Sequence, residues 1–151
     1  MYNRDLGGTR FSPLKQVNTG NVSKLARAWS YPLGKDQTSG TLSGGSEFTP
    51  IVVDGVMYVA ASNHVAALQA DDGTVVWRHD VKTGAPSRRG VAYWPGEGSN
   101  PPRIIFTAGR RLIALKLNTG TLDASFGKEG EVDMVVPYNS VPFIYKNVVV
   151  V

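Results

Sequence analysis

The chain has 151 residues and a net charge of +4, from 16 lysines and arginines against 12 acidic residues. The basic residues are scattered, which argues against a nucleic-acid-binding stripe, and the absence of cysteine excludes disulfides, thiolate zinc sites and a cysteine nucleophile. A composition of 17 glycines, 9 prolines and 42% hydrophobic residues disfavours long helices but suffices for a packed core.

The first forty residues differ in pattern from the rest and predict an N-terminal segment, 1–40, with one short helix and a strand. The helix is expected over Asn18–Ala28, with Asn21 as its N-cap and apolar residues three and four positions apart. Trp29–Tyr31 follows as a strand. Residues 35–45 are rich in Gly, Ser and Thr and predict a loop.

The stretch Thr49–Val81 predicts a meander of antiparallel strands. Its apolar, β-branched runs fit no helical period, and four strands of roughly five to seven residues fit into it. The turns between them are expected at Asp54–Gly55, Asn63–His64 and Asp72–Gly73. The fold class is therefore all-β.

This unit recurs along the chain. Ala67–Gly73 matches Ala114–Gly120 at a spacing of 47 residues, and the run from Pro50 matches the run from Pro142 at 92, or two periods of 46. Four short strands in about 40–50 residues are typical of a β-propeller blade. The pattern predicts a partial propeller of about two to two-and-a-half blades. An ordinary β-sandwich with fortuitous similarity is the alternative.

Trp77 closes the repeat, ten residues after Ala67. A tryptophan at the end of a fourth strand can lie across the edge of the next blade, with its indole N–H on a carbonyl. The second copy has Ala124 at this position, with Phe126 as a substitute. Residues 96–102 (GEGSNPP) predict a turn-rich insertion between strands.

Residues 41–151 are expected to form the first blades of one incomplete propeller domain. Propellers close with about 4–8 blades, and Asn147–Val151 breaks off in mid-strand. We therefore expect the N-terminal piece of a longer protein, in preference to several copies assembling into a ring. No stretch approaches the roughly 18 consecutive apolar residues of a spanning helix, and the first residues lack a signal peptide's apolar stretch.

Local catalytic motifs are lacking. The Gly-rich stretches carry neither the Lys-Ser/Thr of a phosphate loop nor the strand-to-helix context of a dinucleotide fingerprint. His64 at a predicted turn and His79 near a strand end are expected to be solvated or structural rather than ligands.

Glu47 and Arg89 stand directly before the first strands of successive blades. In a propeller the first strand lines the central channel, so both residues are expected to face a shared funnel. An arginine there supplies a bidentate fork for a carboxylate of an anionic ligand. A Glu–Arg pair joining adjacent blades is an equally weighted alternative.

Ordered segments over nearly the whole chain carry a family resemblance: Arg4–Leu14, Asn21–Trp29, Glu47–Tyr58 and Arg89–Ala92. Together they resemble the start of the pyrroloquinoline-quinone (PQQ)-dependent dehydrogenases, the quinoprotein alcohol and glucose dehydrogenases. Phe126–Asp133 resembles the glucose-dehydrogenase branch. The lack of cysteine agrees with that branch, because the alcohol branch typically carries a vicinal cysteine pair where this chain has Pro86–Arg88.

The resemblance implies an eight-bladed propeller with PQQ and a calcium ion in its central channel. Glu47 falls on the family's quinone-contacting Glu, and Arg89 on the Arg that holds a quinone carboxylate. Asn139 falls where relatives often have a quinone-contacting Thr, and it keeps a hydrogen-bonding side chain. The family's calcium ligands and catalytic Asp lie in later blades, so we assign no catalytic or metal-binding residue in this chain.

By this resemblance the function is oxidation of a sugar or alcohol hydroxyl, with a quinone or cytochrome as electron acceptor, in the periplasm. The 151 residues alone are expected to be inactive. The rival function is a non-catalytic propeller of the same repeat type that acts as a binding or assembly scaffold. Such a scaffold needs neither Glu47 nor Arg89, whose presence favours the enzyme. A peptide-binding propeller of the WD type is disfavoured because the WD dipeptide is absent.

Overall fold

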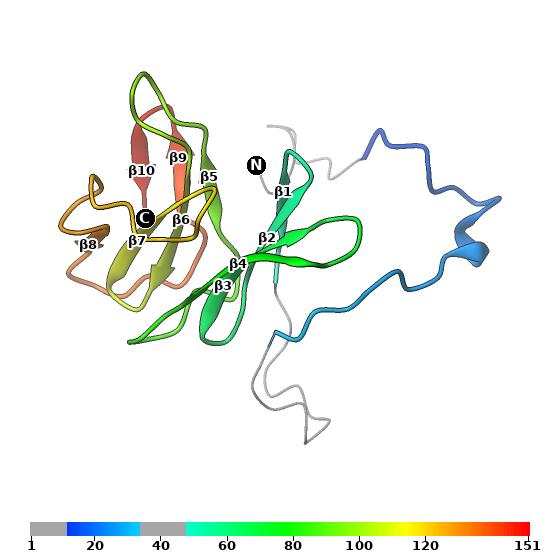
Figure 1. The fold of residues 1–151 in the computed structure, drawn as a ribbon, viewed down its shortest axis with the longest axis horizontal. Coiled ribbons are helices and arrows are strands. Elements are labelled where there is room, and N and C mark those ends of the chain that lie inside the picture. Colours follow the sequence, from blue (N-terminus) through cyan, green and yellow to red (C-terminus); the bar gives the residue numbers. More distant parts are fainter. Residues whose placement is uncertain (1–11, 34–47) are drawn as a thin grey trace.

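Two four-stranded antiparallel sheets and one hairpin follow one another along the chain (Figure 1). The computed structural model describes residues 12–33 and 48–151. The first sheet holds β1 (Ile51–Val53), β2 (Val56–Ala60), β3 (His64–Gln69) and β4 (Val75–Asp80). The second holds β5 (Ala92–Trp94), β6 (Arg103–Ala108), β7 (Arg111–Lys116) and β8 (Glu131–Asp133), and the hairpin holds β9 (Phe143–Tyr145) and β10 (Val148–Val150).

Each sheet pairs its strands in sequence order, as a propeller blade does. Gly55 and Gly73 both adopt positive φ, which the tight turns after β1 and β3 require. The four predicted strands between residues 49 and 81 are therefore confirmed. The insertion at residues 96–102 also lies between two strands, β5 and β6, as predicted.

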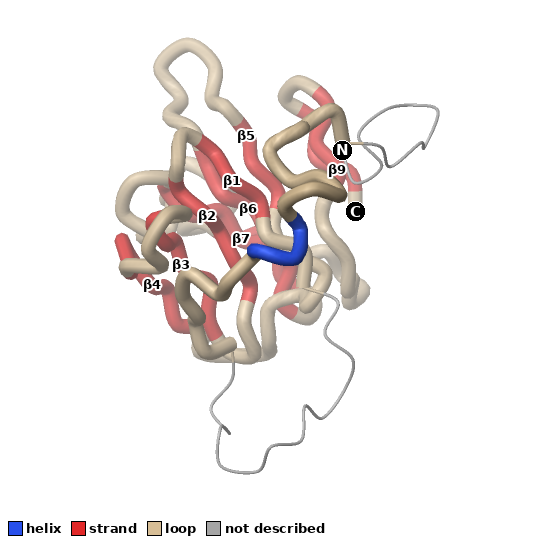
Figure 2. Tube along the Cα trace, turned by 90° about the vertical axis from the view of Figure 1, so that its right-hand side faces the viewer, coloured by secondary structure: helices blue, strands red, loops and turns tan. Residues whose placement is uncertain are grey.

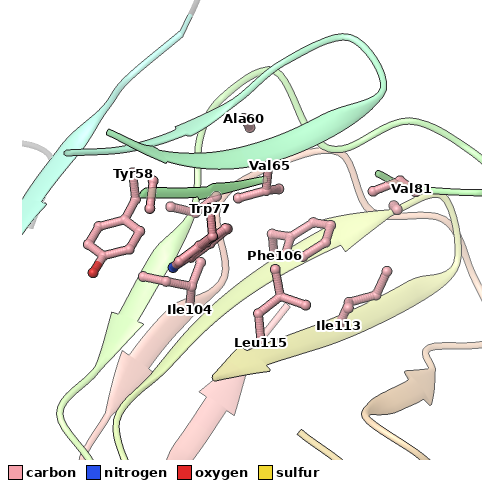
Figure 3. Packing of buried hydrophobic residues seen from close by; sticks show 12 residues of the cluster. Tyr58, Ala60, Val65, Trp77, Val81, Ile104, Phe106, Ile113 and Leu115 are labelled. Carbon is pink, nitrogen blue, oxygen red and sulfur yellow. The ribbon is translucent and has the colours of Figure 1, made fainter. Parts of the chain in front are cut away.

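The main core lies between the two sheets (Figure 3). Tyr58, Val65 and Trp77 of the first sheet meet Phe106 and Leu115 of the second. A second cluster joins the second sheet to the β9–β10 hairpin. The strands β6 and β7 are thus covered on both faces, which explains why their apolar runs are nearly continuous instead of alternating.

The predicted helix over Asn18–Ala28 is wrong. The structure has only the single 3₁₀ turn η1 (Val22–Lys24) there, and Asn21 makes no capping hydrogen bond. The Asn21 side chain instead accepts from the Asn18 N–H at 2.8 Å, a local bond that competes with a helix. Leu25 is 64% exposed, so the segment buries no apolar face that could stabilise a helix.

The predicted strand at Trp29–Tyr31 is also wrong, because these residues belong to no strand, and the described chain that follows η1 is drawn as loop in Figure 2. The segment attaches to the first sheet mainly through side chains, because Trp29, Tyr31 and Leu33 pack against the cluster of Val59, Ala66 and Leu68. One backbone hydrogen bond adds to this packing, from the Ser62 N–H to the Leu33 carbonyl at 2.9 Å. The segment therefore covers the face of the first sheet that the second sheet leaves open. The loop predicted at 35–45 lies outside the described residues.

Trp77 joins the first sheet to the second as predicted. Its indole N–H donates to the Leu117 carbonyl at 2.8 Å, and its ring lies over Gly120, where a Cβ would come within 2.4 Å of the indole. Trp29 repeats this arrangement one period earlier, with its N–H on the Ala70 carbonyl at 3.2 Å and its ring over Gly73. We call this contact a seam: an indole N–H binds a backbone carbonyl and the indole ring covers a glycine. The same seam thus occurs on both faces of the first sheet.

The second sheet makes its seam differently. Phe126 packs against the cluster that includes Ile144 and Val149 of the hairpin. The indole hydrogen bond comes from Trp94 on β5, whose N–H donates to the Lys146 carbonyl at 3.0 Å. In the described part of the chain, no helix combines the length and apolar character that crossing a bilayer requires.

Candidate cofactor-binding site

The segments that lead into the first strands of three successive repeats meet at Gly90. A Cβ placed on this buried glycine would lie 2.5 Å from the Thr49 carbonyl oxygen and 3.6 Å from a methyl carbon of Val141. With φ at +118°, only glycine fits the backbone and the space. Residue 49 precedes β1, residue 90 precedes β5 and residue 141 precedes β9, so three first-strand approaches converge at one point.

Arg89 lies at this convergence, on the loop between β4 and β5, and it is exposed. Its backbone N–H donates to the hydroxyl of Ser87 at 3.3 Å, and Ser87 is only 2% exposed. The Ser87 N–H in turn donates to the Thr107 carbonyl at 2.9 Å. The backbone that carries Arg89 is therefore anchored to β6.

Asn139 lies on the loop between β8 and β9 and is exposed, two positions before Val141. The Ser140 carbonyl beside it accepts a hydrogen bond from the Thr107 hydroxyl at 3.1 Å. On its other side, the Tyr138 N–H donates to the Gly109 carbonyl at 3.1 Å. The structure thus brings the Arg89 and Asn139 loops to the same end of β6.

Glu47 lies outside the described residues. In the sequence it stands two positions before Thr49, whose carbonyl faces Gly90. Its contact with a cofactor, like those of Arg89 and Asn139, stays a prediction.

The donors at this convergence suit an acidic ligand. A guanidinium and a side-chain amide both donate hydrogen bonds, and the guanidinium carries a permanent positive charge. In the described ranges no group of three or more His, Asp or Glu side chains is arranged to hold a metal ion.

Both histidines are structural, as predicted, although His64 is not at a turn. It begins β3 and is 3% exposed, with Nε2 2.8 Å from the Tyr31 hydroxyl and Nδ1 3.0 Å from the Asn63 side-chain oxygen. Burial, and then the charge of Arg78, lower the pKa of His64 and favour its neutral form. His79 donates from Nδ1 to the Gly120 carbonyl at 2.9 Å and so joins the two sheets.

The sequence reasoning missed a buried ion pair in the second sheet. Arg103 donates to Asp123 at 2.5 Å, and its guanidinium lies 4.9 Å from the centre of the Trp94 ring. Burial acts to raise the pKa of Asp123, but hydrogen bonds from Ser125 and then from Arg103 outweigh it and hold the pKa below its usual value. The Asp-x-Ser pattern at residues 123–125 is the sequence feature that indicates a turn held by the Asp123 carboxylate, which accepts from the Ser125 N–H at 3.1 Å.

The reasoning also missed Thr107. It is a hydroxyl residue inside the apolar run of β6, fully buried, and it contacts both loops of the candidate site. A lone polar residue in such a run needs a hydrogen-bond partner, and that was its signal in the sequence.

The chain matches a family model described as "PQQ: Glucose/ethanol/alcohol dehydrogenase, beta-propeller domain" over residues 1–151. It is 36% identical to methanol dehydrogenase [cytochrome c] subunit 1 of Methylorubrum extorquens, over 91% of this chain and 24% of that protein. It is 33% identical to the quinate/shikimate dehydrogenase (quinone) of Acinetobacter baylyi, over 88% and 20%. It is 37% identical to the dehydrogenase subunit of the alcohol dehydrogenase (quinone) of Gluconobacter oxydans, over 80% and 16%.

Among solved structures, a europium-containing methanol dehydrogenase superimposes with a TM-score of 0.71 at 29% identity, over 99% of this chain and 26% of that one. The chain therefore spans about a quarter or less of the length of these relatives. The likeness confirms the predicted partial β-propeller and the family resemblance. The chain belongs to the PQQ-dependent dehydrogenase family and forms part of its β-propeller domain.

Proposed function

We propose that this chain supplies the first blades of a quinoprotein dehydrogenase that oxidises a hydroxyl group of a sugar or an alcohol. The convergence of three first-strand approaches at Gly90 is the observation that carries the proposal. It brings the backbone beside Arg89 close to the segment that carries Asn139, and the family resemblance assigns cofactor contacts to both residues. Membership of the PQQ-dependent family supports the oxidoreductase class.

In this proposal Arg89 holds a carboxylate of PQQ through its guanidinium fork, and Asn139 donates a hydrogen bond from its amide. Glu47 forms the third contact. A carboxylate beside an acidic cofactor must be protonated or shielded by a cation. When bound, PQQ supplies the two-electron acceptor for the hydride of the substrate. The residues of this chain bind and orient the cofactor.

We propose calcium as the accompanying ion, with its ligands and the proton-accepting Asp outside these residues. One similar structure is a europium-containing methanol dehydrogenase. Metal analysis of the full-length protein should therefore measure which ion is bound. Calcium accepts oxygen ligands from carboxylates and amides. We expect a chelator to abolish the dehydrogenase activity of the full-length protein, and added calcium to restore it.

The substrate proposal spans sugars and alcohols. The segment Phe126–Asp133 and the absence of cysteine support the glucose-dehydrogenase branch. The relatives above are named for methanol, alcohol and quinate or shikimate. Comparing kcat/KM for glucose, a primary alcohol and quinate with the full-length protein separates the branches, and a preference for either of the last two removes the glucose assignment.

We also propose a periplasmic location and electron transfer to a quinone or a cytochrome, both by family resemblance. The division into a segment 1–40 and blades 41–151 is part of the same proposal. The 151 residues alone are expected to be inactive. Turnover by this chain with PQQ and calcium alone would contradict that expectation.

The deciding experiment is a PQQ titration of the full-length protein and its variants. Glu47→Gln and Arg89→Ala are each expected to weaken PQQ binding. Arg88→Ala is the matched control, because Arg88 is the exposed neighbour of Arg89. Unchanged PQQ affinity in both site variants would remove the site assignment. A protein that binds no PQQ at all would favour the non-catalytic scaffold.

A further inference from the structure

Thr107 connects the two described loops of the candidate site through different atoms. Its backbone carbonyl accepts the Ser87 N–H at 2.9 Å, two residues before Arg89. Its side-chain hydroxyl donates to the Ser140 carbonyl at 3.1 Å, directly after Asn139. Thr107 has no exposed surface, so water does not compete for either bond.

This hydroxyl is a departure from the repeat. Thr107 pairs with Leu112 across β6 and β7, and Ala60 pairs with Val65 across β2 and β3. Positions 65 and 112 lie 47 residues apart, so Ala60 occupies the place of Thr107 in the first sheet. An alanine fits that place in the fold, so the blade architecture alone does not require a hydroxyl there.

The orientation of Thr107 follows from the alternation of side chains along β6. Phe106 and Ala108 face the core shared with the first sheet, and Ile105 faces the cluster shared with the β9–β10 hairpin. Thr107 lies on the same side of the strand as Ile105, because residues two apart share a face. Its hydroxyl therefore points toward the next repeat and meets the segment that leads into β9.

We propose that Thr107 is a positioning residue for PQQ binding that acts through Asn139. This inference rests on the proposed function, and it adds a residue that touches no cofactor itself. The hydroxyl fixes the Ser140 carbonyl and thereby the backbone from which the Asn139 side chain extends. The Arg89 loop is held by the Thr107 backbone, so changes to the side chain leave that loop in place.

The decisive variant is Thr107→Val, which keeps the shape of the side chain and removes only the hydroxyl. Thr107→Ser restores the hydroxyl, and Ile105→Val is the matched control for a small loss of packing on the same face of β6. In the full-length protein, we expect Thr107→Val to weaken PQQ binding about fivefold, the factor that matches one ordinary hydrogen bond. Thr107→Ser and Ile105→Val are expected to bind like the wild type.

Two further measurements separate positioning from general loosening. Asn139→Ala combined with Thr107→Val is expected to bind PQQ no more weakly than Asn139→Ala alone, because both changes remove the same contact. Without PQQ, amide hydrogen exchange at Tyr138 is expected to speed up in Thr107→Val, while Ser87 exchanges as before. If Thr107→Val does not fold, Thr107→Ala takes its place, since the repeat accepts alanine at the equivalent position.

The outcomes distinguish this inference from the proposed function. If Arg89→Ala weakens PQQ binding and Thr107→Val does not, Thr107 has no positioning role and the function stands. Equal weakening in Thr107→Val and Ile105→Val would assign the effect to packing and overturn the inference. A wild-type protein that binds no PQQ would overturn both.

Discussion

Replacing Gly120 by alanine tests the seam between the two sheets. The backbone at Gly120 has φ of +66°, a conformation that costs an L-residue about 1–2 kcal/mol. The new Cβ would also lie 2.4 Å from Cε3 of Trp77, whereas carbon atoms pack at about 3.5–4 Å. The indole must therefore move by about an ångström or more to admit the new methyl group.

That movement breaks the 2.8 Å hydrogen bond from the Trp77 indole to the Leu117 carbonyl, which is worth about 1 kcal/mol. It also disturbs the packing of a side chain that is only 8% exposed, and complete removal of a buried tryptophan costs about 3–5 kcal/mol. Adding the backbone strain to the lost bond and to part of this packing, we expect Gly120→Ala to lower the free energy of unfolding by about 4 kcal/mol.

Gly55→Ala is the matched control. Gly55 also has positive φ, at +79°, but a methyl group on its α-carbon would have no neighbouring atom within 4 Å, so only the backbone term of about 1–2 kcal/mol applies. Urea unfolding followed by far-ultraviolet circular dichroism measures both variants. In a Trp77→Ala background, Gly120→Ala should cost no more than Gly55→Ala. Equal destabilisation by the two glycine variants in the wild-type background would refute the reasoning.

Two further predictions concern pH. Because hydrogen bonds depress the pKa of folded Asp123, the stability it contributes is present above its unfolded pKa of about 3.9 and is lost as the pH falls through the folded value. Asp123→Asn should lower the free energy of unfolding by about 3 kcal/mol at neutral pH, since it leaves Arg103 without its partner. When the urea midpoint is plotted against pH, the decline at acid pH should be shallower in this variant than in the wild type. An unchanged decline would contradict this. The pKa of His64 is also depressed, so stability should begin to fall as the pH drops below its unfolded pKa of about 6.5. His64→Gln should remove that step, and nuclear magnetic resonance titration of the imidazole should show the low pKa directly.

The strands of the first sheet could be predicted from sequence because each is bounded by a local turn signal such as Asp54–Gly55. The period of the repeat likewise predicts that Trp77 lies against the next blade, although it does not identify Leu117 as the partner. The helix over Asn18–Ala28 failed for the opposite reason. Its apolar residues fit a helical spacing, but whether a helix forms depends on a surface for that face to pack against, which local sequence does not specify.

The candidate site was predictable only in outline. Its position before successive first strands followed from the repeat, and Arg89 and Asn139 do lie on such approaches. The meeting of Thr49 and Val141 at Gly90 joins residues about forty to fifty positions apart in sequence, which no local pattern encodes. Glu47 stays a prediction from the sequence alone.

The seam at Trp77 has a consequence for how these proteins diverge. The Trp77 indole donates to the backbone carbonyl of Leu117 and covers the α-carbon of Gly120. Its partner in the next repeat is therefore peptide backbone, and the contact requires no specific side chain apart from the glycine. Substitutions elsewhere in the receiving turn leave the joint intact as long as its glycine is retained. Where two blades are joined in this way, their surfaces and channel-lining residues are thus free to vary independently without loss of the contact that holds them together.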